Sequence, residues 1–300
     1  MENKSEKNKG GNRLRLPVIL LAAALICLAL YLHFFLMDRK MREQQETVTE
    51  NVLSMREGGT EQASVAESTL TREEEKAKSE EEPAPVKEEA REHYPEVTAA
   101  QTENPDIIGL LEYGPDSMFY VVQGVDNDFY LDHDYLGESA VGGAAMLDVR
   151  SLLNPRSVTW IIHGHNMKNE TMFGNLRHFR ETDFLKDNPV LTLTLPDEKQ
   201  YYAIFAVLDV NVDEGEEGYF KITEFDFEDE EAYNAYTSYY IDHSYFELPV
   251  DTGWGDELLI LSTCSYGYSN GRLLIVSRRL REGETPDGIK KIFAESAVKK

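Results

Sequence analysis

The chain has 300 residues, enough for about two ordinary domains, and its 55 acidic and 30 basic side chains give a formal net charge of −25 at pH 7. This charge excludes a nucleic-acid partner bound through counterion release, because such binding needs a basic surface. The two cysteines exclude a disulfide framework, whereas 41% apolar and 10% aromatic residues are sufficient for a hydrophobic core.

The first predicted element is a membrane-spanning helix over residues 16–37, preceded by a basic cytoplasmic tail over residues 1–15. The span contains no Asp, Glu, Lys or Arg, and its roughly 22 residues give about 33 Å of helix, close to the ~30 Å hydrocarbon core of a bilayer. It is longer than the apolar region of a cleaved signal peptide, which indicates an uncleaved signal anchor. Five basic residues precede the span and three follow it closely, which favours a cytoplasmic N-terminus. We therefore expect a single-pass protein of the cell membrane with its main domain outside the cell.

Residues 38–104 are predicted to form an acidic, extended and disordered linker with at most transient helix. Acidic side chains outnumber basic ones, and Tyr94 is the single aromatic residue between positions 43 and 104. Such a segment cannot bury enough apolar area to offset the entropy lost on ordering. We interpret it as a spacer that holds a domain away from the membrane, with docking to a basic partner as the alternative.

Residues 105–300 are predicted to form one globular, mainly β domain. Strand-like runs rich in Val, Ile, Thr and Tyr recur with turn signals between them, as in a barrel or sandwich. Apolar residues at helical spacing predict helices over 170–185 and 227–246. The runs are MFYVVQG (118–124), SVTWIIHG (157–164), PVLTLTLP (189–196), QYYAIFAVLDV (200–210), DELLILSTC (256–264) and RLLIVSRRL (272–280).

Cys264 is the one cysteine of this domain, since Cys27 lies in the apolar span. A free cysteine is often a small buried hydrophobe, but LLILSTC ends a strand and the loop SYGYSNG leads from it to Arg272. If 257–264 and 272–280 form a hairpin, Cys264 and Arg272 are directly opposed, with Cβ atoms about 5 Å apart. A guanidinium there favours the thiolate and can donate hydrogen bonds to an oxyanion. The alternative is that Arg272 is an edge charge paired with a carboxylate.

A thiolate that attacks an amide needs a proton donor for the leaving amine, normally a histidine. Five of the seven histidines lie in the membrane span, the linker, the predicted helices or a polar loop. His163 and His165 remain, and spacing does not choose between them because residues two apart on an extended chain point to one face. A zinc site on this H-x-H pair is the rival interpretation, and it lacks an obvious third ligand. The acidic loop 209–218 is not spaced like an EF-hand, so we expect a solvated loop rather than a calcium site.

Around these residues the chain resembles the sortases, and specifically the class B sortases. The resemblance covers roughly residues 105–283, with the His, Cys and Arg motifs in the family's order and spacing. The motifs are NPDIIG (104–109), VVQG-x-DNDFYLDHD-x-x-G (121–137), GGAAMLD (142–148), GHNM followed by TMFGNL (164–176), and LSTC (261–264) with its downstream Arg.

The resemblance implies a closed sortase β-barrel of about eight strands with added helices, of which 227–246 matches a helix of class B enzymes. It implies that Cys264 is the nucleophile, that His165, which follows Gly in G-H-N, is the acid and base, and that Arg272 is the third catalytic residue. His163 departs from the family, in which Tyr is common at this position, and we expect it to influence His165. No cofactor and no metal is implied. The candidate substrate contacts are Ser262, Thr263, Asn166 and Tyr266.

By this resemblance the expected function is that of a membrane-anchored cysteine transpeptidase of a Gram-positive cell surface. It cleaves a sorting motif near the C-terminus of secreted proteins and joins the acyl product to an amino group of a peptidoglycan precursor or another amine acceptor. The alternatives are a sortase that assembles pili, an exported cysteine peptidase that hydrolyses without transfer, and a surface receptor without catalysis.

Overall fold

The computed structural model describes residues 15–73, 93–115 and 117–300, and the chain divides into two compact units, Met1–Glu43 and Gln44–Lys300. The first unit contains the beginning of helix α1 (Arg15–Glu73), whose apolar side chains over residues 19–36 are exposed. Among the described residues this is the one helix long and apolar enough to cross a membrane, with a mean hydropathy of 2.6 in an 18-residue window. The helix expected over residues 16–37 is therefore present as a candidate membrane span.

The second unit is built on a closed barrel in the strand order β1-β2-β3-β4-β8-β9-β6-β5, with β5 pairing back onto β1. The β2–β3 and β4–β8 pairs are parallel and the other pairs are antiparallel. The predicted closed barrel of about eight strands is confirmed. Its strands are β1 (Ile107–Tyr113), β2 (Ser117–Val122), β3 (Ala145–Leu147), β4 (Thr159–His163), β5 (Val190–Thr194), β6 (Lys199–Asn211), β8 (Leu258–Ser265) and β9 (Gly271–Arg279).

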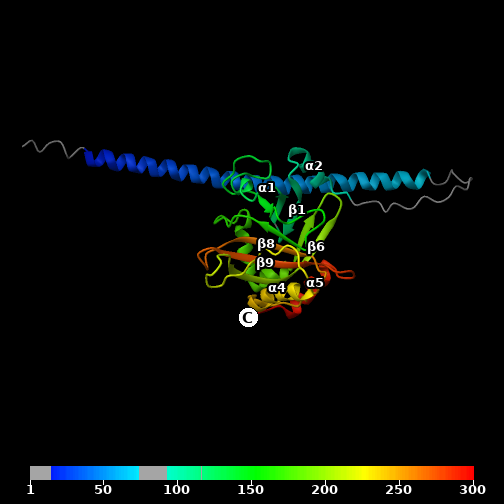
Figure 1. The fold of residues 1–300 in the computed structure, drawn as a ribbon. Helices are drawn as coiled ribbons and strands as arrows, with labels where there is room; N and C mark the ends of the chain where they lie inside the picture. The colour runs from blue at the N-terminus through cyan, green and yellow to red at the C-terminus, as the bar shows by residue number, and fades with distance from the viewer. Residues whose placement is uncertain (1–14, 74–92, 116) are drawn as a thin grey trace, which may run out of the picture. The chain divides into compact units, whose positions relative to one another are not determined.

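Short helices and a small second sheet, β7 (Phe246–Glu247) with β10 (Val298–Lys299), surround the barrel. Helices α4 and α5 lie at the opposite side of the barrel from α2 (Figure 1). The predicted tyrosine face of α4 is confirmed, because Tyr233, Tyr236 and Tyr240 are all buried. The helices are α2 (Pro95–Glu103), η1 (Phe129–Leu131), η2 (Phe173–Arg180), α3 (Thr182–Asp187), α4 (Glu230–His243) and α5 (Pro286–Ser296).

The predicted helix over residues 170–185 is divided into two pieces, the 3₁₀ helix η2 and the short α3. Glu181 between them has an extended backbone (φ −99°, ψ 127°), which breaks the helical path. Its apolar side chains still face inward, because Leu176 and Phe179 are fully buried. The helical spacing therefore identified the buried face but not the break.

The central strands β8 and β9 carry near-continuous apolar runs, LLIL and LLIV, that are buried along their length. Strands covered on both faces have this composition, whereas half-exposed strands alternate with polar residues. In β8 one position departs from this burial: Cys264 is exposed at the end of the strand. The core thus fixes the strand and leaves Cys264, its next-to-last residue, open to solvent.

The expectation of an extended linker over residues 38–104 needs correction at both ends. Helix α1 continues to Glu73, and residues 95–103 form α2. Val48 and Val52, four residues apart and therefore on one helical face, are buried in a cluster with α2, β1 and β2. Burial of this face against the barrel supplies the apolar contact that the acidic composition seemed to exclude. Residues 74–92 lie outside the described residues.

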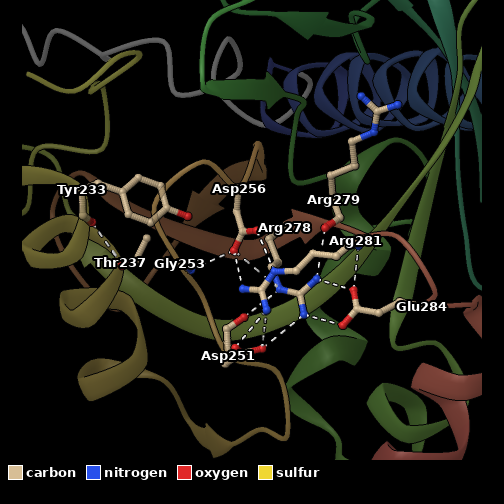
Figure 2. A network of polar contacts seen from close by, with 9 residues as sticks. All are labelled: Tyr233, Thr237, Asp251, Gly253, Asp256, Arg278, Arg279, Arg281 and Glu284. Carbon is tan, nitrogen blue, oxygen red and sulfur yellow. Dashed lines mark hydrogen bonds and ion pairs between the residues drawn. The ribbon is translucent and has the colours of Figure 1, made fainter. Parts of the chain in front are cut away.

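Charged side chains tie the end of β9 to the loop 251–256 and to Glu284, just before α5 (Figure 2). Arg278 is 1% exposed and donates from Nε to the carbonyl of Asp251 (2.7 Å) and from Nη1 and Nη2 to the carboxylate of Glu284 (2.6 and 2.8 Å). Arg281 donates to both oxygens of Asp256, each at 2.8 Å. Hydrogen bonds from Arg278 hold the pKa of Glu284 below its ordinary value.

Candidate active site

Cys264 and Arg272 are brought together by the antiparallel pairing of β8 with β9. The register pairs Cys264 directly with Arg272, as the predicted hairpin requires. Directly opposed residues of an antiparallel pair point to the same face, with Cβ atoms about 4.5–5.5 Å apart. The thiol is exposed and the guanidinium is half-buried, so both groups are available at one surface of the barrel.

The parallel pairing of β4 with β8 brings the G-H-N segment to the same strand end. His163 is paired with Ser262 in the ladder, and the backbone N–H of Gly164 donates to the carbonyl of Ser262 (3.2 Å). The hydroxyl of Thr263 donates to the carbonyl of Gly164 (2.8 Å). The segment that follows β4 therefore stays beside β8 beyond the last residue of β4.

His165 and Asn166 follow at the level of the cysteine. The side-chain amide of Asn166 donates to the carbonyl of Cys264 (2.7 Å), which holds this loop against the end of β8. The Nε2 atom of His165 lies 2.8 Å from the carbonyl of Leu131. Because a carbonyl only accepts hydrogen bonds, Nε2 carries the hydrogen, and in the neutral ring Nδ1 is the basic nitrogen.

The guanidinium of Arg272 is held by neutral acceptors of its own loop. Nη1 donates to Oδ1 of Asn270 (2.8 Å) and to the carbonyl of Gly271 (3.0 Å). The amide of Asn270 donates in turn to Oδ1 of Asp213 (2.9 Å). Within the described chain Arg272 forms no ion pair with a carboxylate, so its charge is not neutralised by a direct neighbour.

His163 belongs to a different set of contacts from His165. Its Nε2 lies 3.1 Å from Oδ2 of Asp148, a fully buried carboxylate that also accepts two hydrogen bonds from the Arg150 guanidinium (2.9 and 2.7 Å). Burial alone would raise the pKa of Asp148, but hydrogen bonds from Arg150 and His163 outweigh it and hold this pKa far below its ordinary value. Among the described side chains, no hydrogen bond or ion pair joins His163 to His165. The expected influence of His163 on His165 therefore has no direct contact behind it.

The four candidate substrate contacts fall into two groups. Ser262 and Thr263 are 1% and 2% exposed, and Thr263 is engaged with β4, so their burial argues for a structural role in the barrel wall. Asn166 is half-buried and Tyr266 is 79% exposed in the loop that follows Cys264. Of the four, these last two side chains are the ones accessible at the surface.

The site contains acceptors and supports that sequence reasoning missed. The Leu131 carbonyl is a backbone group and has no side-chain signature, and Asn270 reads as an ordinary turn residue in SYGYSNG. Among the described residues no group of three or more His, Cys, Asp or Glu side chains is placed to hold a metal ion. His163 and His165 are directed to different partners, Asp148 and Leu131.

No family model matches the chain. It is 30% identical over 183 residues to sortase B of Listeria monocytogenes, which covers 60% of this chain and 72% of that protein. The X-ray structure of Clostridium perfringens sortase B is similar with a TM-score of 0.56 and 31% identity, covering 61% of this chain and 99% of that one. A substrate complex of Staphylococcus aureus sortase B, at 22% identity, shares the fold with a TM-score of 0.57, covering 64% and 87% of the two chains.

A closed eight-stranded barrel that presents a thiol and a guanidinium on paired strands, beside a histidine loop, defines a sortase-type protein. With the relatives above, the chain belongs to the class B sortases. It is accordingly an enzyme of the sortase transpeptidase kind.

Proposed function

We propose that this sortase is a membrane-anchored cysteine transpeptidase in which Cys264 is the nucleophile, His165 the general acid and base, and Arg272 the oxyanion donor. The observation that supports it most directly is the pairing of Cys264 with Arg272 in the β8–β9 register, beside a loop fixed to the Cys264 carbonyl by Asn166. A hairpin that carries Cys264 and Arg272 and a loop about a hundred residues earlier that carries His165 thus meet at one end of the barrel.

The first half-reaction is cleavage of a sorting motif near the C-terminus of a secreted protein. The Cys264 thiolate attacks the carbonyl carbon of the scissile peptide bond, and Arg272 donates hydrogen bonds to the oxygen as it becomes negative. The tetrahedral intermediate then collapses as its C–N bond breaks and His165 gives a proton to the departing amine. A thioacyl-enzyme remains, with the acyl carbon bonded to sulfur.

The second half-reaction is transfer to an amine. An amino group of a peptidoglycan precursor, or another amine acceptor at the cell wall, attacks the thioacyl carbon and gives its proton to His165. The C–S bond breaks, a new amide bond remains, and Cys264 leaves as the thiolate. His165 thus returns to the protonated form in which it began.

The substrate class is carried over from the relatives, among which a sortase B has been observed in complex with a substrate. We propose that residues 1–15 are cytoplasmic, that residues 16–37 cross the membrane once, and that the catalytic domain is extracellular. The compact unit that contains the barrel begins at Gln44, so we place the start of the folded extracellular part there rather than at residue 105.

The test is a transfer assay with the full chain in detergent, a library of pentapeptide motifs and several amine acceptors, followed by mass spectrometry. Wild type is expected to yield acceptor-joined peptide and a thioacyl adduct on Cys264. Cys264→Ala should abolish cleavage and transfer with unchanged circular dichroism, while the matched control Cys27→Ser keeps both activities. Turnover of Cys264→Ala near that of wild type would refute the thiol mechanism.

The same assay separates the alternatives. A cysteine hydrolase releases peptide whose yield and identity do not change when amine is added. A receptor without catalysis gives no product, and a methanethiosulfonate reagent labels Cys264 no faster than an ordinary exposed thiol. A sortase that assembles pili prefers a lysine side chain of a protein acceptor over short cell-wall amines.

A further inference from the structure

Residues 44–57 of α1, expected to be part of a passive spacer, are packed against the barrel within the second unit. Val48 is 4% exposed and Val52 is fully buried, and both belong to a cluster with Val97 of α2, Tyr120 of β2 and Tyr130 of η1. The contact is made by the β1–β2 side of the barrel, which also carries the segment between β2 and β3. The helix therefore has a defined packing position on the catalytic domain.

Arg56 fixes this packing position at one end of the segment. Its guanidinium donates to Glu96 of α2 (2.9 Å) and, through two nitrogens, to both oxygens of Glu112 of β1 (2.9 and 2.8 Å). These carboxylates raise the pKa of Arg56 above its ordinary value. A bidentate pair is geometrically specific, so it sets the position of the helix along the barrel.

Gln44 makes the contact at the other end. Its side-chain amide donates to Oδ2 of Asp134 (2.8 Å), and Asp134 is only 5% exposed. The second oxygen of Asp134 accepts from the backbone N–H groups of Leu136 and Glu138, each at 3.0 Å. One oxygen of the carboxylate thus organises the turn. Gln44 donates a hydrogen bond to the other oxygen, which the turn does not use.

This turn directly follows the segment that binds the histidine. Leu131, whose carbonyl lies 2.8 Å from Nε2 of His165, ends η1 three residues before Asp134. Its neighbour Tyr130 is buried in the same cluster as Val48 and Val52, and the Tyr130 hydroxyl donates to Asp106 (2.8 Å). Leu131 therefore lies between Tyr130, a member of the apolar cluster that includes Val48 and Val52, and Asp134, which contacts Gln44 of α1.

We propose that Gln44 and Asp134 are positioning residues for His165, acting through the Leu131 carbonyl. The inference rests on the proposed role of His165 as acid and base. Gln44 holds Asp134, Asp134 holds the turn after η1, and the Leu131 carbonyl keeps the hydrogen on Nε2 so that Nδ1 exchanges the proton. The helix that leaves the membrane span is thereby part of the catalytic apparatus.

The test compares Gln44→Ala and Asp134→Ala with the matched control Gln45→Ala, all in the full chain in detergent. Gln45 is the same residue type one position on, and its side chain has no hydrogen-bond partner among the described residues. For each of the first two variants we expect kcat to fall about tenfold at nearly constant KM, a part of the 10²–10⁴ that acid–base catalysis supplies. The double variant should fall no further than Asp134→Ala, because the two residues act through one contact.

A second readout distinguishes positioning of the His165 ring from a general effect on the stability of the fold. In protein labelled with ¹⁵N-histidine, at a pH high enough for the ring to be neutral, the His165 ring, assigned by its loss in His165→Ala, should report the Nε2–H form in wild type and a mixture of the two neutral forms in Gln44→Ala. Unchanged kcat, or an unchanged ring spectrum with losses that follow thermal stability alone, would overturn the proposal. Full activity of His165→Ala would instead overturn the proposed function.

Discussion

At the scale of single residues, the contacts of Arg272 explain how an arginine at a strand end can stabilise an oxyanion. Its partners Asn270 and Gly271 supply neutral oxygens, whereas most other arginines described in the barrel unit face carboxylates. A carboxylate in contact would cancel the positive potential that a developing oxyanion needs. Neutral acceptors orient the planar fork and leave its charge available to the Cys264 side of the strand.

This reasoning predicts the effect of Arg272→Lys. A lysine keeps the charge but cannot reproduce the fork that bonds to Asn270 and to an oxyanion at once. We expect kcat/KM for transfer to fall by about 10²–10³, the cost of one lost oxyanion donor, with the midpoint of thermal unfolding unchanged. Arg279→Lys, on the same strand, is the control. If Arg272→Lys and the control transfer peptide equally well, the oxyanion role is wrong.

The two histidines of the G-H-N region show the limit of spacing arguments at this scale. His163 and His165 are two residues apart, yet one ring contacts a buried aspartate and the other a backbone carbonyl. Gly164 between them lies so close to Phe173 that a Cβ there would be 2.7 Å from its ring, and this close approach sets the direction of the chain. The resemblance to a family singled out His165, whereas spacing alone could not.

At the scale of elements, the Arg278 network of Figure 2 joins β9, the 251–256 loop and Glu284, which lies just before α5. The guanidinium is buried and contacts Asp251, Asp256 and Glu284. Arg281 also pairs with Asp251 and Asp256, so removal of Arg278 leaves Glu284 without its arginine partner and the carbonyl of Asp251 without its donor. Breaking a buried pair in this way is costly, even though an intact pair adds little net stability.

We therefore expect Arg278→Met to lower the free energy of unfolding by about 3–5 kcal/mol. Arg279→Met removes the neighbouring arginine, whose partners Glu198 and Glu257 are partly exposed, and should cost about 1 kcal/mol or less. Urea unfolding followed by the fluorescence of Trp160 and Trp254, both in the barrel unit, measures the two losses. Equal losses of unfolding free energy in the two variants would mean that burial of the arginine does not determine the cost of removing it.

The same scale explains which parts of the fold and site were predictable. The β8–β9 hairpin, and with it the Cys264–Arg272 pair, follows from two apolar runs joined by a turn-rich loop. The neighbourhood of His165 and Cys264 depends on the parallel β4–β8 pair, whose strands are about a hundred residues apart, and no local pattern encodes such a pairing. β3 has three residues, too few for a periodic signal. In residues 44–57 only Val48 and Val52 mark the buried face, so composition indicated a spacer.

At the scale of the whole molecule, the net charge of −25 makes the behaviour in acid informative. The described carboxylates with a clearly lowered pKa include the fully buried Asp148 and the Arg-bound Asp251 and Glu284. Each binds its proton more weakly in the folded than in the unfolded chain. As the pH falls, the unfolded state takes up more protons, so these groups stabilise the fold above their unfolded pKa, near 4, and lose that contribution below it.

Asp148→Asn isolates one of these groups, because every other ionisable residue stays the same and the effects of net charge largely cancel in the comparison with wild type. The variant should be less stable than wild type from pH 7 down to about pH 4.5, where Asp148 is ionised in both the folded and the unfolded wild-type chain. Below pH 4 the difference should shrink by about 1.4 kcal/mol per pH unit, the value for one proton taken up on unfolding. Urea unfolding between pH 3 and 7, monitored by tryptophan fluorescence, measures it. The exposed Glu216→Gln should follow wild type throughout, and a pH-independent deficit in Asp148→Asn would show that Asp148 acts through packing rather than through its charge.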